Sequence, residues 1–312
     1  MPPTEARPEA DRDPEGLLLV DKPSGPTSHD VVSRARRALD EGRVGHTGTL
    51  DPFATGLLLL LVGRATRLAE YFHRLEKAYR ATLRLGEETD THDRTGETRR
   101  SSEAWHGLER GELEEALSGF RGELLQRPPA YSAKQVEGRR AHEAAREGEL
   151  LQLEPEEVTV HELELVGWEP PEAELRAVVG TGTYVRSLAR DLGRELGVGA
   201  HLTALRRTRV GPFEVDDALA GDELEPGVRL ESPHFRPPAD AVSWLPRRRV
   251  TEEERRRIGH GQRIDAGEIV PGAGDGEPGA GDPVALVGEA GLVAVAELLP
   301  GALQPRKVFD AG

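Results

Sequence analysis

The stretch GHTGTLDPFATGLLLLLV, residues 45–62, joins a tight polar loop to a long apolar run. The loop carries His46 and the acid Asp51, which Pro52 follows directly. The apolar run at 57–62 predicts a buried strand, and a carboxylate on a rigid loop beside a buried element is common in active sites. An Asp-Pro pair is also a common start of an ordinary turn, so these residues alone leave the chemical role of Asp51 open.

The composition of the 312-residue chain limits the classes of protein to consider. The length suits one large or two ordinary domains. The absence of cysteine excludes disulfides, thiolate metal ligands and a cysteine nucleophile. No apolar run approaches the roughly 20 residues that cross a bilayer, and residues 1–15 are polar and proline-rich, unlike a secretory signal. We therefore expect a cytoplasmic protein with a disordered tail at residues 1–15.

The net charge of −15 argues against a polyanionic partner only if the charge is evenly distributed. Residues 43–84 carry seven Arg or Lys against three Asp or Glu, and residues 181–209 carry six against two. Because these two basic blocks lie within an acidic chain, the net charge does not exclude a nucleic-acid partner. Arginine supplies nearly all of the bases, a bias that a GC-rich genome and a high-salt habitat would both produce.

Apolar and alternating patterns predict a mixture of strands and helices. Thr27-Ser28-His29-Asp30 has the form of a capping box and predicts a helix that begins there. The expected strands are 16–20, 57–62, 79–85, 158–168 and 174–179, and the expected helices are 27–39, 113–120 and 184–196. Strands and helices without regular alternation favour an α+β fold around a mixed sheet.

The last third of the chain differs in composition from the rest. Residues 214–240 are acidic and proline-rich, which suits a linker. A short basic helix at 251–258 follows, and then a hairpin with strands at 284–287 and 292–295. These elements predict a small β-rich second domain over residues 245–312.

Other polar segments carry residues capable of chemistry, each with an ordinary alternative. Tyr79 opens a strand between two bases, but it could be a plain strand aromatic. A glycine-rich turn at 180–183 leads into a helix with Arg186 in its first turn, yet it lacks dinucleotide and P-loop spacing. A proline-rich segment at 128–134 precedes several arginines.

Two common kinds of catalytic site are not supported by the spacing of the residues. A metal site built from His46, Asp51, His92 and Asp93 lacks the H-x-H or H-x-x-x-H pair that such sites use. A serine triad is disfavoured because no Gly-x-Ser-x-Gly elbow occurs. What stands out is a carboxylate, a tyrosine, an arginine able to pair with the acid, and basic blocks. That combination suits an enzyme acting on a nucleotide within RNA.

The chain resembles the TruB family of tRNA pseudouridine synthases from Gly16 to about Val215, with a weaker match beyond. The resemblance rests on LVDKP (19–23), GHTGTLDPFATGLL (45–58), KAYR (77–80), PAYSAK (129–134), GTYVRSL (182–188) and LTALRR (202–207). Several blocks in the right order are far more specific than any one of them.

The family isomerises uridine 55 in the T-loop of tRNA by exchanging the C1′–N1 glycosidic bond for a C1′–C5 bond. The resemblance implies that Asp51 is the catalytic aspartate, that Arg186 pairs with it, and that Tyr79 lies against the target base. A carboxylate can attack the base, attack C1′ or remove a sugar proton, and the sequence leaves these steps open. The resemblance implies no metal and no cofactor.

The target uridine is stacked inside a folded loop, so it must be flipped into the enzyme. By resemblance, His46 fills the vacated space, Tyr184 and Leu205 line the pocket, and residues 128–148 close over the RNA. Further candidates for RNA contact are Lys77, Lys134, Arg139, Arg140, Arg146 and Arg206.

The resemblance also implies the domain organisation and the partners. We expect a pseudouridine synthase fold with a mixed, mainly antiparallel sheet at residues 16–240 and a PUA-like RNA-binding domain at 245–312. The expected partner is tRNA, bound by a monomer without an obligatory protein partner and away from membranes. One alternative is a guide-RNA-dependent synthase of the dyskerin type, although this chain lacks long basic tails. The other is a non-catalytic protein that folds or binds tRNA.

Overall fold

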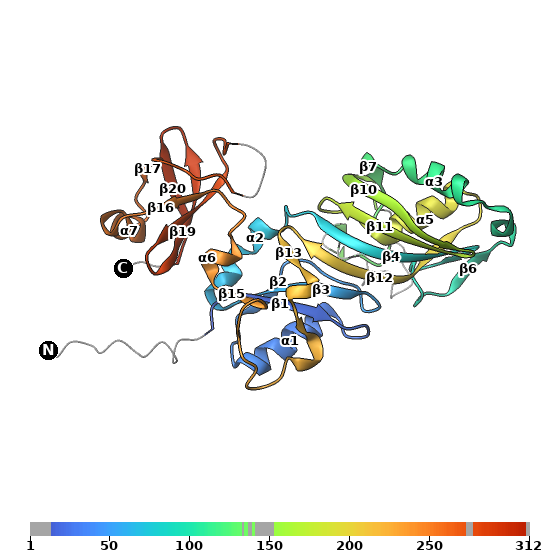
Figure 1. The fold of residues 1–312 in the computed structure, drawn as a ribbon, viewed down its shortest axis with the longest axis horizontal. Helices are drawn as coiled ribbons and strands as arrows, with labels where there is room; N and C mark the ends of the chain where they lie inside the picture. The colour runs from blue at the N-terminus through green and yellow to red at the C-terminus, as the bar shows by residue number, and fades with distance from the viewer. Residues whose placement is uncertain (1–13, 133, 137–138, 141–152, 273–276, 310–312) are drawn as a thin grey trace.

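The computed structural model describes residues 14–132, 134–136, 139–140, 153–272 and 277–309. The molecule is elongated, with a large mixed sheet through its body and a β-rich C-terminal domain at one end (Figure 1). The prediction of an α+β fold with a mixed, mainly antiparallel sheet is confirmed, because only the β1–β14 and β3–β12 pairs of the described main sheet are parallel.

The main sheet has the strand order β14-β1-β3-β12-β4-β11-β10-β7. Along this order the strands are β14 (Leu219–Ala220), β1 (Gly16–Lys22), β3 (Thr55–Val62), β12 (Ala200–Val210), β4 (Lys77–Leu85), β11 (Glu172–Val179), β10 (Glu156–Glu169) and β7 (Gly122–Gln126). Three strands pair off this path: β2 (Val44–His46) with β3, β13 (Phe213–Glu214) with β12, and β15 (Phe235–Arg236) with β1.

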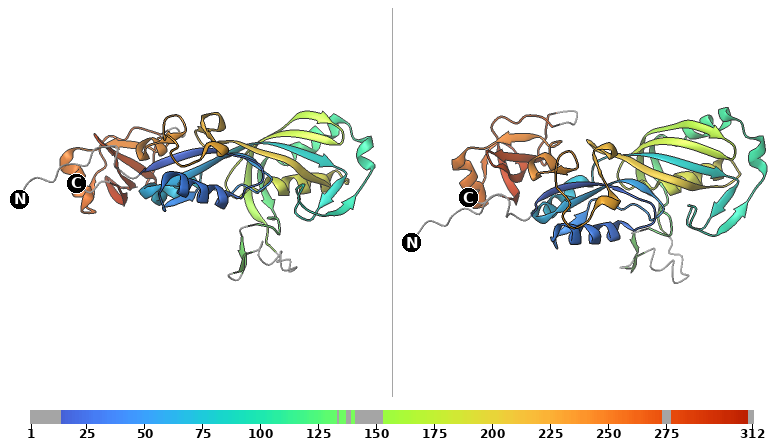
Figure 2. Two further views of the ribbon diagram at one scale, coloured as in Figure 1. Left: turned by 90° about the horizontal axis from the view of Figure 1, so that it is seen from below. Right: turned by 60° about the horizontal axis from the view of Figure 1, so that its bottom comes forward.

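Helices and short hairpins cover or extend this sheet. The helices are α1 (Ser28–Leu39), α2 (Ala69–Phe72), α3 (Arg110–Ser118), α5 (Val185–Glu195) and α6 (Pro238–Ala241), with 3-10 turns η2 (Gly63–Leu68), η3 (Ala104–Gly107), η4 (Val215–Asp217) and η5 (Gly221–Glu223). The hairpins are β5 (Glu87–Thr89) with β6 (Thr98–Ser101), and β8 (Gln135–Val136) with β9 (Arg139–Arg140). In Figure 2 the β8–β9 pair projects away from the main sheet. Among the described residues, no helix is long and apolar enough to cross a membrane.

The apolar run at β3 is buried on both faces of the sheet. Leu58 and Leu60 belong to the core cluster that includes the buried face of α1, whereas Leu57, Leu59 and Leu61 belong to a second cluster that reaches the C-terminal domain. A strand covered on both faces needs apolar residues at every position, which is why the sequence shows a continuous run instead of alternation.

Helix α1 begins as its sequence predicts. The Thr27 hydroxyl accepts from the backbone N–H of Asp30, and the Asp30 carboxylate accepts from the backbone N–H of Thr27, which completes a capping box. Val31, Val32 and Ala35 then face the core. The helix ends at Leu39, and the residue that caps it, Asp40, has a left-handed φ of 50°.

The two halves of the main sheet meet where β3 and β12 pair over two residues only, Thr55 and Gly56 with Arg206 and Arg207. Gly56 has a φ of 102°, and a Cβ there would lie 2.2 Å from the Arg207 carbonyl oxygen. Only glycine permits this approach of the two backbones.

We expect Gly56→Ala to destabilise the protein by about 3 kcal/mol or more, because alanine would be strained at this φ and would collide with backbone. Urea unfolding measures the change. The matched control is Gly42→Ala, where the added Cβ meets nothing within 4 Å. Equal stabilities of the two variants would contradict the prediction.

The prediction of a linker at residues 214–240 is wrong. This segment carries η4, β14, η5, β15 and α6, and it adds strands to β1 on the main sheet. Strands of two residues are too short to show the alternation of apolar and polar residues that predicts a strand. They exist because their backbone groups bond to the neighbouring strand, which the sequence does not reveal. The acidic, proline-rich composition was therefore the only signal, and it suggests a linker.

The C-terminal domain contains a five-stranded sheet, as the predicted hairpin and β-rich character require. Its elements are β16 (Arg247–Arg249), α7 (Glu252–Gly259), β17 (Ile264–Asp265), β18 (Pro283–Gly288), β19 (Gly291–Leu299) and β20 (Ala302–Val308). The Arg64 and Arg67 guanidinium groups donate to the carbonyl oxygens of Phe309 and Val308, and Lys307 pairs with Glu70. The expected tail at 1–15 lies outside the described residues up to Asp13, and Glu15 pairs with Arg64.

Candidate active site

The loop between β2 and β3 carries Asp51, and hydrogen bonds to α1 and β3 hold its backbone in place. The buried Ser28 hydroxyl donates to the Leu50 carbonyl and accepts from the Leu50 N–H. The N–H of Thr47 donates to Leu59 of β3, and the N–H of Ala54 donates to the Asp51 carbonyl. These bonds fix the loop on both sides of the carboxylate, so Asp51 stands on a rigid support.

Lys22, at the end of β1, is fully buried beneath this loop. Its Nζ donates to the carbonyl oxygens of Pro23, Pro26 and Pro52, at 2.9, 2.8 and 3.3 Å. Burial lowers the pKa of Lys22 to about 8, and the Asp51 carboxylate opposes this shift. Sequence reasoning did not single out Lys22, although a lysine at the end of a buried strand and directly before a proline is a detectable signal.

We expect the Lys22→Met variant to lose a pH-dependent part of the stability. The unfolded lysine has a pKa of about 10.4. Between that value and the folded value of about 8, the unfolded chain binds more protons, so the wild-type free energy of unfolding rises with pH. From pH 7.5 to 9.5 this rise is about 2 kcal/mol more for the wild type than for the variant. Urea unfolding at both pH values measures it, and parallel behaviour of the two proteins would contradict it.

Arg186, in the first turn of α5, forms a two-point ion pair with Asp51. Its Nε lies 2.8 Å from Oδ2 and its Nη2 lies 3.1 Å from Oδ1 of the carboxylate. The arginine side chain is 5% exposed and the aspartate side chain 31% exposed, so the pair faces solvent only through the acid. The guanidinium also donates to the carbonyl oxygens of Thr91 and Tyr131. All of these contacts fix the direction of the carboxylate.

The protonation of Asp51 is balanced between burial and charge. Burial raises the pKa of the Asp51 carboxyl above its usual value, and the nearby Asp93 carboxylate adds to this shift. The Arg186 guanidinium opposes it by favouring the ionised form. The ion pair with Arg186 thus favours the ionised form of a sparsely solvated carboxyl, whereas burial and Asp93 favour the neutral form. A carboxyl in such surroundings suits attack or proton transfer.

Asp93 is a second acid at Arg186, and its place in this network was not predicted. Its Oδ2 lies 3.9 Å from the Arg186 Nη1, and its Oδ1 accepts from Thr91 and Thr95. The adjacent His92 has a buried Nδ1 without a hydrogen bond, and burial lowers its pKa to about 4. Within the described residues, no group of three or more His, Asp or Glu side chains could hold a metal.

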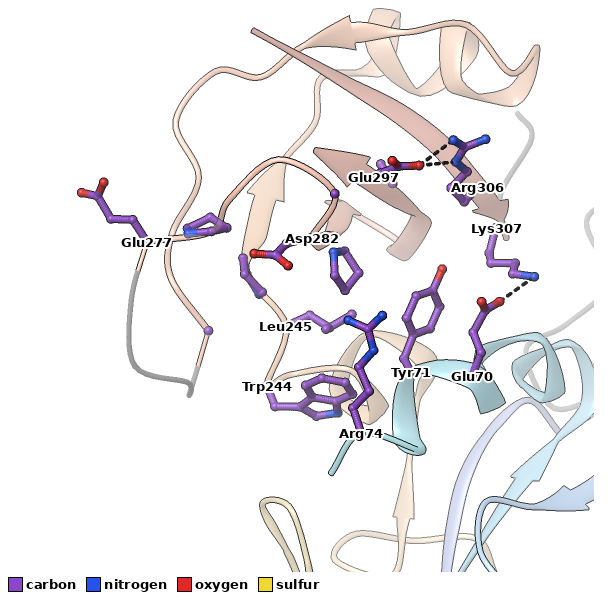
Figure 3. Close-up of a pocket in the computed structure, with 16 residues that line it drawn as sticks. Glu70, Tyr71, Arg74, Trp244, Leu245, Glu277, Asp282, Glu297, Arg306 and Lys307 are labelled. Atoms are coloured by element: carbon purple, nitrogen blue, oxygen red, sulfur yellow. Dashed lines mark hydrogen bonds and ion pairs between the residues drawn. The ribbon is translucent and has the colours of Figure 1, made fainter. Parts of the chain in front are cut away.

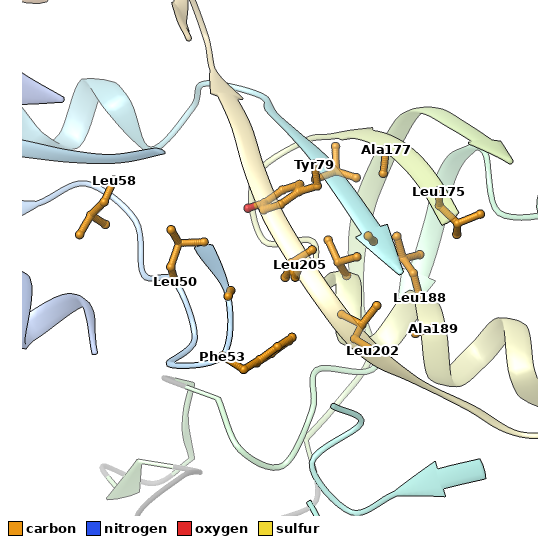
Figure 4. Close-up of a cluster of buried hydrophobic side chains, with 14 of the residues drawn as sticks. Leu50, Phe53, Leu58, Tyr79, Leu175, Ala177, Leu188, Ala189, Leu202 and Leu205 are labelled. Atoms are coloured by element: carbon orange, nitrogen blue, oxygen red, sulfur yellow. The ribbon is translucent and has the colours of Figure 1, made fainter. Parts of the chain in front are cut away.

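Tyr79 and Leu205 contribute to the apolar cluster that also contains Leu50, the residue directly before Asp51. They come from the neighbouring strands β4 and β12 and lie in one buried cluster (Figure 4). Tyr184 precedes α5, and its backbone N–H and carbonyl are both bonded to the buried Gln126 side chain. Gln126 thus holds the start of the helix that carries Arg186, which sequence reasoning did not detect.

The predicted RNA contacts differ in their surroundings. His46 is half-buried at the end of β2, with a pKa lowered by burial. Lys77 donates to the carbonyl oxygens of Leu75 and His73, and burial lowers its pKa to about 8. Arg206 pairs with both oxygens of Asp21, and Lys134 pairs with Glu156. The backbones of Arg139 and Arg140 form β9, whereas Arg146 lies outside the described residues.

A cavity of about 610 Å³ lies elsewhere, between α2 and the C-terminal domain (Figure 3). Tyr71, Arg74 and Trp244 line it together with Asp282 and Glu297. None of the predicted site residues borders this cavity. The catalytic candidates therefore lie outside this cavity.

Two family profiles match the chain in sequence. The profile described as "TruB family pseudouridylate synthase (N terminal domain)" matches residues 36–185, and that of the "tRNA pseudouridylate synthase B C-terminal domain" matches residues 186–232. A protein named tRNA pseudouridine synthase B from Thermobifida fusca is 44% identical over 305 residues, which cover 95% of this chain and 98% of the relative. The chain belongs to the TruB family.

Other TruB relatives and solved structures agree with this assignment. The tRNA pseudouridine synthase B of a Synechococcus strain is 43% identical, with 96% of this chain and 98% of the relative covered. A chain in an H/ACA ribonucleoprotein bound to a substrate RNA containing 2′-deoxyuridine has a TM-score of 0.73 and 26% identity, over 97% of this chain and 87% of that one. A chain of a Cbf5-Nop10-Gar1 complex also has a TM-score of 0.73, at 28% identity and with the same coverage. The pseudouridine synthase fold predicted from sequence is confirmed.

Proposed function

We propose that this chain is a tRNA pseudouridine synthase that isomerises uridine 55 of the T-loop. The observation that carries the proposal is the two-point pair between Asp51 and Arg186, which fixes the direction of the carboxyl group. The relatives named tRNA pseudouridine synthase B, matched over nearly their whole length, support tRNA as the substrate.

Asp51 is the group that meets the flipped nucleotide. The reaction breaks the C1′–N1 bond, turns the uracil and forms the C1′–C5 bond, while C5 loses a proton and N1 gains one. Atoms and electrons balance within the substrate, so the protein has to supply a carboxylate, a fixed binding surface and proton transfer. Tyr79 and Leu205 provide the apolar surface against which the uracil lies, and Tyr184 closes the pocket from the helix side.

The RNA must open its T-loop for the uridine to reach Asp51. His46 lies on the same loop, five residues before the acid, and we assign to it the space that the flipped base vacates. We assign Lys134, Arg139 and Arg140 to phosphate contacts. Most of the expected closing segment at 128–148 (133, 137–138 and 141–148) lies outside the described residues. Lys77, Lys134 and Arg206 already have protein partners, so each would have to exchange that partner for a phosphate.

We assign residues 16–240 to the catalytic domain and residues 245–312 to a PUA-like RNA-binding domain. The end of α6 at Ala241 and the start of β16 at Arg247 support this division. We further propose that the protein acts in the cytoplasm, as a monomer and without an obligatory protein partner. The guide-dependent alternative is favoured only by the similarity to Cbf5 chains, which is weaker in sequence than the similarity to TruB relatives.

The test uses the purified chain and an unmodified tRNA transcript, with pseudouridine mapped at nucleotide resolution. We expect pseudouridine at position 55 and nowhere else in the transcript, with no added protein or guide RNA. A transcript with cytidine at position 55 is the control and should stay unmodified. Activity that requires a guide RNA would identify the dyskerin-type alternative, and tight binding without pseudouridine would identify a non-catalytic tRNA-binding protein.

A further inference from the structure

Arg207 is a buried arginine on β12 whose guanidinium donates to backbone carbonyl groups of the described residues. Its side chain is among the most buried of the charged groups, at 3% exposure. Nε donates to Leu57 at 2.7 Å, Nη2 to Gly48 at 3.1 Å and Nη1 to Thr49 at 3.4 Å. The planar guanidinium therefore binds the Asp51 loop on both sides of the acid. It bonds to Gly48 and Thr49 before the acid, and to Leu57 at the start of the apolar run after it.

We propose that Arg207 is the positioning residue that holds the Asp51 loop in its reactive shape. The proposal rests on the proposed function, because it concerns the loop that presents Asp51 to the uridine. The Arg207 guanidinium donates to backbone carbonyl groups of the described residues and forms no ion pair with Asp51, so it acts through the backbone. A displacement of about 1 Å at a reacting group can lower a rate about a hundredfold.

The backbone geometry explains why an arginine can reach these carbonyls. Arg207 pairs with Gly56 where β12 meets β3, and the missing Cβ of Gly56 lets the two strands approach. In the antiparallel pairing with β4, Arg207 lies opposite Tyr79. Directly opposed residues point to the same face of a sheet, so Arg207 shares a face with Tyr79. The residue thus links the strand of the base-contacting tyrosine to the loop of the acid.

Arg207 differs from the neighbouring arginines in the partners of its guanidinium group. Arg186 pairs with Asp51 and Arg206 pairs with Asp21, whereas within the described residues no ion pair to a carboxylate is found for Arg207. Its positive charge lowers the pKa of Lys22 and of His46. A cation with carbonyl partners only, and with almost no exposure, is placed to organise the loop and not to bind phosphate.

The experiment compares Arg207→Met, Arg207→Lys, Arg207→Ala and the control Arg209→Met in the full-length chain. Arg209 lies on the same strand and is partly exposed in an ion pair with Glu76, away from the loop carbonyls. Three quantities are measured for each protein: the single-turnover rate of pseudouridine formation in a tRNA transcript, the Kd for that transcript, and the midpoint of thermal unfolding.

We expect the rate to fall about a hundredfold in Arg207→Met, with a Kd within about threefold of the wild type. Arg207→Lys keeps the charge but lacks the planar fork, so it should recover only part of the rate. Millimolar guanidinium should partly restore Arg207→Ala by occupying the vacated position, and should leave Arg209→Met unchanged. A rate that recovers while the midpoint of thermal unfolding stays unchanged separates positioning of the loop from a purely structural role.

Several outcomes would overturn the proposal. These are a rate loss no larger than that of Arg209→Met, a loss confined to Kd, and an unfolded Arg207→Lys protein, which would make the residue a requirement of the fold. Failure of guanidinium to restore a folded Arg207→Ala would also overturn it. Failure of the proposed function is distinct, since the wild type itself would then form no pseudouridine.

Discussion

Replacing Asp51 with asparagine is expected to abolish pseudouridine formation while the protein still binds tRNA. Asparagine keeps the size of the side chain but cannot act as a nucleophile or accept the proton, so the rate should fall about 10⁴-fold or more. The Kd for the same transcript should stay within about threefold, because one neutral substitution inside the pocket removes no phosphate contact. Single-turnover conversion and filter binding measure the two quantities separately.

A matched control for this variant is Asp217→Asn. Asp217 also pairs with an arginine, Arg236, at 2.8 Å, but on η4 and away from the loop. Its variant should convert tRNA at close to the wild-type rate. Residual activity of Asp51→Asn near that of the control would show that the carboxylate is not the reacting group, and the enzyme hypothesis would then lose its main support.

Replacing Arg186 with methionine is expected to have the second-largest effect. It leaves the Asp51 and Asp93 carboxylates near each other without their shared cation, so the pKa of Asp51 rises further. Removing one partner of a buried ion pair lowers the free energy of unfolding by about 3–5 kcal/mol. The lower end of this range applies here, because Asp51 is partly exposed to solvent. We expect activity at neutral pH to fall at least about a hundredfold.

The pH dependence of activity should show in which direction the pKa of Asp51 shifts when Arg186 is replaced. Activity that needs the ionised carboxylate rises as pH increases through the pKa of Asp51. The acid limb of the wild-type profile should therefore lie above the usual range of an aspartate, since burial raises that pKa. In Arg186→Met the limb should move to still higher pH, and Arg186→Lys should lie between the two. Superimposable profiles from pH 5 to 9 would contradict the assigned role of Arg186.

Local patterns predicted the elements that depend on local interactions. The capping box at Thr27 is formed by residues three apart, and the apolar run at Leu57 must be buried wherever the chain places it. The linker prediction for residues 214–240 failed because two-residue strands carry no period and exist only through pairing with β1. Elements formed by partners distant in the sequence are thus the ones that local patterns miss.

The candidate site divides in the same way. The chemical types of Asp51, Tyr79 and Arg186 were visible in the sequence, and the family resemblance related them to one reaction. Asp93 was considered beside His92 as a metal ligand, yet it lies at the Arg186 guanidinium instead. Residue type can suggest chemistry, but the partner of a charged group is set by which strands and turns lie side by side.

The sequence by itself determined the family, the mixed sheet and the acid on its polar loop, because motifs and apolar periods are properties of neighbouring residues. Only the tertiary structure decided what surrounds that acid. Arg186 lies 135 positions from Asp51 and Arg207 lies 150 positions from Leu57, and each pair meets through a hydrogen bond. Those contacts form because the two halves of the sheet join at β3 and β12. Lys22 and Arg207 are buried near this junction, and loop carbonyls serve as their hydrogen-bond partners.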